Sequence, residues 1–165
     1  MELYFLRHGD AVSGEKWKGR DAQRPLSPQG VALMERESPA ISLLCPGLDL
    51  ILTSPLVRAR QTAEIVARRL GQQNVLEVED RLSPGFGVDE LAAIIRERHV
   101  AASLMLIGHE PDFSRVISAC IGGGRVEVKK GSLIRVDLEK TSSLSGVLAW
   151  NLPPRALAPD PPPAP

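Results

Sequence analysis

The sequence MELYFLRHGD (residues 1–10) decides the fold, because it joins a short apolar run directly to a polar cluster. Leu3 to Leu6 have the residue types and the length of a buried β-strand. The polarity then changes abruptly to Arg7, His8 and Gly9. In an open α/β sheet, ligands bind outside the carboxyl ends of the strands. This stretch therefore predicts a strand that delivers an anion-binding arginine and a nucleophilic histidine to a ligand-binding crevice.

Length and composition indicate one globular domain of ordinary character. The chain has 165 residues, of which 43% are hydrophobic and 24% charged, and its formal net charge is zero. A neutral chain has no overall field that would favour nucleic acid or a membrane surface as a partner. Cys45 and Cys120 form no CxxC pair and lie in apolar surroundings, so we expect buried thiols in a reducing compartment. No apolar run approaches ~18 residues and no signal peptide is indicated, so we expect a cytoplasmic protein, and a monomer.

Strand-like and helix-like segments alternate along most of the chain. The expected strands after the first are 48–53, 75–78 and 103–107, and the expected helices are 28–44, 55–70, 89–99 and 111–120. Ser27-Pro28 and Ser54-Pro55 are typical helix starts, and Pro39 should kink or restart the first helix. Such alternation predicts a three-layer α/β/α sandwich with a mostly parallel central sheet, whose strands have their carboxyl ends at one edge.

The last part of the chain departs from this alternation. Residues 133–138 and 146–151 have the pattern of an antiparallel strand pair that closes the sheet. From Pro153 onward, seven of thirteen residues are proline. We therefore expect one domain over residues 1–152 and a disordered Pro-rich tail over residues 153–165.

Four basic side chains should meet at the carboxyl edge of the sheet. Arg7 and His8 follow the first strand, Arg58 lies in the first turns of the helix after the second, and His109 follows the strand 103–107. Guanidinium groups offer planar forks of donors that match phosphate oxygens, and helix amino termini add N–H groups. The set predicts a pocket for a phosphoryl group.

A metal site made of His8, Asp10 and His109 is disfavoured, because the neighbouring arginines would repel a cation. We therefore expect no metal.

These motifs make the chain similar to the histidine phosphatase superfamily, also called phosphoglycerate mutase-like, and in particular to its small SixA-type phosphohistidine phosphatases. The resemblance rests on four blocks in the family's order, which are Arg7-His8-Gly9, Arg24-Pro25-Leu26-Ser27, the segment 54–63 and Gly108-His109. A bare Arg-His-Gly is a weak signal, whereas four blocks at the expected strand and helix ends are a strong one. The resemblance covers the chain up to the Pro-rich tail.

The resemblance implies a cofactor-independent phosphatase in which His8 attacks phosphorus and forms a phosphohistidine intermediate that water then cleaves. Arg7, Arg58 and His109 would neutralise the phosphoryl oxygens, and the arginine charges would lower the pKa values of the histidines. Gly9 would let the backbone approach the phosphate closely. The block that contains Arg24 assigns that arginine to substrate binding.

The general acid is the point at which the chain departs from the family. Larger relatives use a carboxylic acid from an inserted segment, or one just after the second histidine. Glu110 stands just after the second histidine, at a position where relatives that use an acid there typically have aspartate. Asp10 and Glu15 are alternative acids. A phosphohistidine leaving group needs less protonation than an alkoxide. The lack of a clear acid therefore favours P–N over P–O substrates and predicts phosphohistidine on a signalling protein as the substrate.

Two other functions stay open, namely a small-molecule phosphomonoesterase of the same superfamily and a non-catalytic phosphate-binding module. The short chain has no large inserted cap, which leaves the pocket accessible to a macromolecule. The segment with Lys16, Lys18, Arg20 and Arg24 then either faces the partner or additional phosphates, or is simply solvated.

Overall fold

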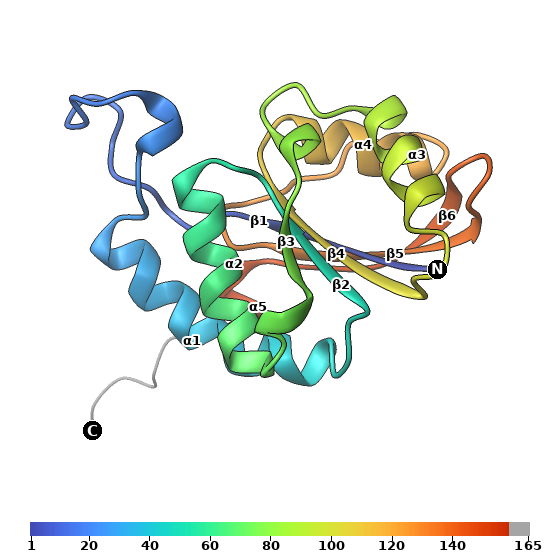
Figure 1. Ribbon diagram of the computed structural model, residues 1–165, viewed down its shortest axis with the longest axis horizontal. Coiled ribbons are helices and arrows are strands. Elements are labelled where there is room, and N and C mark those ends of the chain that lie inside the picture. Colours follow the sequence, from blue (N-terminus) through green and yellow to red (C-terminus); the bar gives the residue numbers. More distant parts are fainter. Residues whose placement is uncertain (159–165) are drawn as a thin grey trace.

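A six-stranded sheet forms the centre of the computed structural model, which describes residues 1–158 (Figure 1). The strands are β1 (Glu2–Arg7), β2 (Leu50–Thr53), β3 (Leu76–Val78), β4 (Ser103–Gly108), β5 (Leu133–Lys140) and β6 (Ser145–Leu152). Their order in the sheet is β3-β2-β4-β1-β5-β6. The first four strands run parallel, whereas β5 is antiparallel to β1 and β6 to β5. The predicted fold class is confirmed.

Helices cover both faces of the sheet (Figure 1). One face carries α1 (Pro28–Leu44), α2 (Val57–Leu70) and α5 (Pro154–Leu157), and the other carries α3 (Val88–Glu97) and α4 (Asp112–Cys120). Three short 3-10 helices lie in connections, namely η1 (Asp21–Gln23), η2 (Gln73–Val75) and η3 (Asp80–Leu82). Within residues 1–158, no helix is both long enough and apolar enough to cross a membrane.

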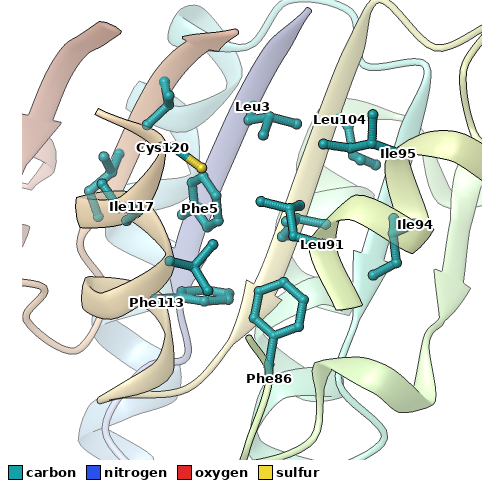
Figure 2. Packing of buried hydrophobic residues seen from close by; sticks show 14 of the residues in the cluster. Leu3, Phe5, Phe86, Leu91, Ile94, Ile95, Leu104, Phe113, Ile117 and Cys120 are labelled. Atoms are coloured by element: carbon teal, nitrogen blue, oxygen red, sulfur yellow. The ribbon is translucent and has the colours of Figure 1, made fainter. Parts of the chain in front are cut away.

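Alternate residues of β1 feed two hydrophobic cores. Leu3 and Phe5 face α3 and α4, while Tyr4 and Leu6 face α1 and α2. Figure 2 shows the first core, where the ring of Phe5 meets that of Phe113 edge-on at 5.3 Å between centroids. Burying one such side chain stabilises the fold by about 1.5–3 kcal/mol. The cores on both faces therefore hold β1 rigidly in the middle of the sheet.

The two cysteines lie one in each core. Both are buried free thiols, as the sequence predicts. Burial raises the pKa of Cys45 to about 12 and that of Cys120 to about 11, so both thiols stay protonated at neutral pH.

Helix α1 matches its predicted bounds but is not interrupted at Pro39. Ser27 caps its first turn, because the Ser27 hydroxyl accepts the Gly30 N–H at 2.9 Å. Proline removes one N–H from the helix, and this leaves the carbonyl of Glu35 without its usual partner. The Ser38 hydroxyl donates to that carbonyl at 2.9 Å. The helix therefore does not restart at Pro39, because a neighbouring side chain satisfies the carbonyl.

Two of the boundaries that differ from the prediction change the role of a residue. Helix α2 begins at Val57 rather than Pro55, and Ser54 does not act as its N-cap. The expected disorder from Pro153 onward is wrong for residues 153–158, because α5 places Leu157 in the core beside α1 with only 4% of its surface exposed. In the sequence, the abundance of proline gave no indication that Leu157 is buried. Residues 159–165 lie outside the described part of the chain.

The register of the parallel strands brings three connections to one edge. Arg7 pairs with Gly108, and Thr53 pairs with Ile107, so β1, β2 and β4 end at the same level. The N–H of His8 donates to the Gly108 carbonyl at 3.1 Å. The residues that follow these strands therefore share one site at the carboxyl edge.

Candidate active site

His8 lies at the base of the site, with its imidazole fixed at both nitrogens. Its Nδ1 is 2.7 Å from the carbonyl oxygen of Gly9, which can only accept a hydrogen bond. Nδ1 therefore carries the proton, and Nε2 keeps its lone pair. The Nε–H of Arg58 points at that Nε2 from 3.3 Å. Burial, assisted by the charge of Arg58, lowers the pKa of His8 to about 4, so the imidazole is neutral near pH 7.

Two guanidinium groups flank this imidazole. Arg58 comes from the first turn of α2 and is almost entirely buried. Arg7 ends β1, and its Nη1 donates to the carbonyl of Val128 at 2.8 Å. Its Nε is buried and has no hydrogen-bond partner among the described residues. This orphan donor lies beside His8 in sequence and suits a phosphoryl oxygen.

His109 completes the cluster from the end of β4. The centroid of its ring is 5.0 Å from that of His8. Its Nε2 lies 2.8 Å from the Ser54 hydroxyl, and its Nδ1 is buried without a partner among residues 1–158. If the Ser54 O–H donates to Nε2, then Nδ1 carries a proton that a phosphoryl oxygen can accept. Burial and the neighbouring His8 and Arg58 lower the pKa of His109 to about 3.

Gly9 has a packing role in the structure, and its close approach to phosphate stays a prediction. Its N–H donates to the Thr62 hydroxyl at 3.1 Å, so this donor is already engaged. A Cβ at position 9 would lie 2.8 Å from Cγ of Met34 in α1. The glycine is therefore required for packing of β1 against α1, and its carbonyl fixes the tautomer of His8.

The three carboxyl groups predicted as possible acids differ in their surroundings. Glu110 lines the same cavity as Arg7, and its Oε1 accepts the Ser114 N–H of α4 at 2.9 Å. Asp10 accepts hydrogen bonds from Lys130 and Ser27, and the Lys130 bond lowers its pKa, so it stays ionised.

Glu15 is exposed in the segment between β1 and α1. Glu110 is therefore the best placed of the three to protonate a leaving group.

One open cavity adjoins the cluster through Arg7, and another lies along the segment between β1 and α1. One, of about 420 Å³, is lined by Arg7, Glu110 and Lys129, among others. The other, of about 560 Å³, is lined by Lys16, Arg24, Lys130 and neighbours.

Two of the nitrogen atoms of Arg24 are engaged within the protein, and its substrate-binding role stays a prediction. Its Nε donates to Asp21 and its Nη1 to the carbonyl of Val12. Both bonds hold the segment between β1 and α1, so Arg24 is part of that segment's internal structure.

Sequence reasoning missed three polar side chains at this site. Ser54 was expected to be a helix cap and Thr62 was assigned no role at the site, yet they contact His109 and Gly9. Asp21 accepts two hydrogen bonds from Arg58 through its carboxylate and carbonyl. The motif Ser54-Pro-Leu-Val-Arg58 places a hydroxyl beside the arginine, and this was the available signal. Asp21 lies in an irregular segment whose sequence gives no such signal.

Among the described residues, no cluster of three or more His, Cys, Asp or Glu side chains is arranged to hold a metal ion.

Comparison with known proteins places this geometry in a family. The family model described as histidine phosphatase superfamily (branch 1) matches residues 3–103. The chain belongs to the histidine phosphatase superfamily. Its fold and its relatives further show that it is a hydrolase of the phosphatase type.

Several relatives support this membership. An uncharacterized protein of Picosynechococcus is 35% identical over 140 residues, which cover 81% of this chain and 83% of the relative. The phosphohistidine phosphatase SixA of Escherichia coli is 26% identical and covers 93% of this chain and 94% of its own. The solved structure of the protein histidine phosphatase SixA with tungstate superposes with a TM-score of 0.84 at 25% identity, covering 95% and 99% of the two chains. These relatives identify a SixA-like histidine phosphatase.

The same fold is also found in a phosphatase with another substrate. The alpha-ribazole phosphatase of Shigella flexneri superposes with a TM-score of 0.70 at 17% identity and covers 93% of this chain and 97% of its own. This likeness concerns the fold alone.

Proposed function

We propose that this histidine phosphatase removes phosphoryl groups from phosphohistidine on a signalling protein in the cytoplasm. It would act as a monomer and without a cofactor, through a phospho-His8 intermediate. The observation that carries the proposal is the state of His8. Its Nδ1–H is bonded to Gly9, so the lone pair on Nε2 faces Arg58 in a buried and cationic site. A neutral imidazole with its proton on Nδ1 has the tautomer and charge that attack through Nε2 requires.

The first step forms a bond between His8 Nε2 and phosphorus while the bond from phosphorus to the substrate nitrogen breaks. The departing imidazole keeps the electron pair of that bond and takes up a proton from solvent water. Arg7, Arg58 and His109 stabilise the charge on the three equatorial oxygens as the bonds change. In the second step water attacks phosphorus and loses a proton to solvent, the electron pair of the broken bond returns to Nε2, and inorganic phosphate leaves. His8 then returns to its neutral form.

The surroundings of the acids favour a phosphoramidate over a phosphomonoester. Asp10 is held as a carboxylate by Lys130, so it has no proton to give to an alkoxide. An imidazole is a much better leaving group and needs less help. The likeness to SixA, described as a phosphohistidine phosphatase, points the same way.

A second candidate is a phosphatase that acts on small phosphomonoesters. The observation that favours it is the position of Glu110, which lines the cavity beside Arg7. A protonated Glu110 could supply the proton that an alkoxide leaving group requires.

A kinetic comparison of substrates separates the two candidates. We would measure kcat/KM for a phosphohistidine-bearing protein, a sugar phosphate and a nucleotide monophosphate, in the wild type and in Glu110→Gln. The glutamine keeps an oxygen for the Ser114 N–H, so α4 stays capped. Glu127→Gln is the matched control, because Glu127 is an exposed glutamate that lines the same cavity.

The proposal expects the phosphoramidate to be the best substrate and to lose little rate in Glu110→Gln. A strong preference for a small phosphomonoester, with a large loss in that variant, would identify Glu110 as the general acid and this protein as a small-molecule phosphatase.

A further inference from the structure

The buried guanidinium of Arg58 is held by a residue from an exposed segment. Nη1 of Arg58 donates to the main-chain carbonyl of Asp21 at 3.0 Å, and Nη2 donates to its carboxylate at 3.1 Å. The side chain of Arg58 is 6% exposed, whereas that of Asp21 is 63% exposed. Asp21 belongs to η1, in the segment that projects from the body between β1 and α1 (Figure 1). A projecting segment therefore reaches back into the catalytic cluster.

The contacts leave part of Arg58 available. A guanidinium group has five N–H donors in a rigid plane. Two of them go to Asp21, and the Nε–H points at Nε2 of His8. The two remaining N–H groups have no partner in Asp21 or His8. Because the plane is rigid, holding the Nη end also fixes the direction of the Nε–H.

Asp21 is itself held by Arg24. Nε of Arg24 donates to the Asp21 carboxylate at 2.8 Å, and the main-chain N–H of Arg24 donates to the Asp21 carbonyl at 3.0 Å. Arg24 is anchored in turn by a bond from Nη1 to the Val12 carbonyl. The hydrogen bond from Arg24 is the main cause that lowers the pKa of Asp21, so the carboxylate is ionised near pH 7. The charge of Arg24 also offsets the repulsion between this carboxylate and a phosphoryl anion.

We propose that Asp21 is a positioning residue, which fixes the Arg58 guanidinium so that its free donors meet the phosphoryl group on His8. An unrestrained arginine side chain has rotamer entropy, part of which is lost when it binds an anion. Asp21 removes that freedom before the substrate arrives. The proposal rests on the proposed function only in that a phosphoryl group binds beside His8. It does not depend on the identity of the leaving group.

The same contacts also fit the opposite role, in which Asp21 competes with the substrate. A carboxylate bound to Arg58 could instead occupy the place of the phosphoryl group, so that the substrate has to displace it. The two alternatives predict opposite effects of removing the carboxylate, because a positioning residue helps anion binding and a competitor hinders it.

The test measures binding of tungstate, a phosphate analogue, by calorimetry to the full-length protein. Asp21→Ala removes the carboxylate, and Asp21→Asn keeps an oxygen acceptor without the charge. Gln23→Ala is the matched control, because Gln23 is an exposed residue of the same η1. Both Asp21 variants are also made in an Arg58→Ala background, and thermal unfolding checks that every variant folds.

We expect Asp21→Ala to weaken tungstate binding about tenfold, in line with the loss of one charge-assisted hydrogen bond. Asp21→Asn should have a smaller effect and Gln23→Ala none. In the Arg58→Ala background, loss of Asp21 should change nothing further, because Asp21 acts through Arg58. In an NMR spectrum, the Arg58 Nε–H signal should exchange with water faster in Asp21→Ala, while the backbone amide signals stay unchanged.

Three results would overturn the positioning role. These are tighter tungstate binding in Asp21→Ala, an equal loss with and without Arg58, and an unchanged Nε–H signal. Failure of the proposed function looks different. If the wild type binds tungstate but does not cleave phosphohistidine, the proposed substrate is wrong and the role of Asp21 still stands. If the wild type binds no tungstate, both proposals are wrong.

Discussion

The imidazole of His8 should stay neutral in mildly acidic solution, and titration of the protein tests this expectation. Burial is the main cause that lowers its pKa to about 4, and the charges of Arg58, Arg7 and Lys130 add to it. At pH 5 an imidazole with the ordinary pKa of about 6.5 is about 3% neutral, whereas one with a pKa of about 4 is about 90% neutral. The acid limb of kcat/KM that reports His8 should therefore lie well below pH 6.

The same shift affects stability in a defined direction. The unfolded chain binds a proton at position 8 below about pH 6.5, whereas the native state does so only below about pH 4. The contribution of His8 to the free energy of unfolding is therefore complete above pH 6.5 and is lost as the pH falls towards 4. Its size is about 3 kcal/mol, since each pKa unit corresponds to about 1.4 kcal/mol.

The assay is an NMR titration of the imidazole C2–H signals between pH 3.5 and 8. The signals are assigned with the single variants His8→Gln, His99→Gln and His109→Gln. Lys130→Gln should raise the pKa of His8, because it removes a positive charge and also leaves Asp10 without its lysine partner. A His8 signal that titrates near 6.5 in the wild type would refute the reasoning, because the site would then not hold a neutral nucleophile by burial.

Three further predictions follow from single contacts. Ser54→Ala should lower kcat about tenfold without unfolding the protein, because His109 loses the hydroxyl that is hydrogen-bonded to its Nε2. Steady-state kinetics and thermal unfolding check this, and an unchanged kcat would contradict it. Glu37 is fully buried, and both of its carboxylate oxygens lack a hydrogen-bond partner among the described residues. Burial raises the pKa of Glu37 to about 8, so the native state loses stability as the pH rises from 4.5 to 8. Glu37→Gln should therefore raise the melting temperature more at pH 8 than at pH 5, and an equal change at both pH values would be inconsistent with a protonated native carboxyl. Gly30→Ala should destabilise the fold by about 3 kcal/mol in urea unfolding, because its Cβ would lie 1.9 Å from a backbone oxygen. Gly14→Ala is the control and should change the stability little, because no atom lies within 4 Å of its Cβ. Equal stabilities of the two variants would contradict the prediction.

Periodicity and strand-end polarity were sufficient to predict the sheet, its helices and the convergence of the basic residues. The reason is that β1 and β4 each combine an apolar run with a histidine just after it, and the parallel register aligns the two ends. Helix ends were less predictable. Ser54-Pro55 has the sequence of a helix start, yet Ser54 contacts His109 and the helix begins later. A local pattern does not show which tertiary partner a side chain finds.

The remaining differences have the same origin in long-range packing. Leu157 follows two prolines, and only the core beside α1 makes this segment helical and buried. Asp21 lies in an irregular segment, and its bonds to Arg58 join residues 37 positions apart in the sequence. The lack of space for a side chain at Gly9, where a Cβ would lie 2.8 Å from Cγ of Met34, depends on how α1 packs. None of these contacts has a periodic or local signature.

The central claim is that His8 carries the phosphoryl group during turnover. The most direct measurement is to mix the protein with a labelled phosphoryl donor, quench within milliseconds without acid, and locate the label by mass spectrometry. We expect acid-labile phosphate on His8 in the wild type, and neither label nor turnover in His8→Ala. Turnover that survives in His8→Ala, label on another residue, or activity that requires an added divalent metal would contradict the mechanism.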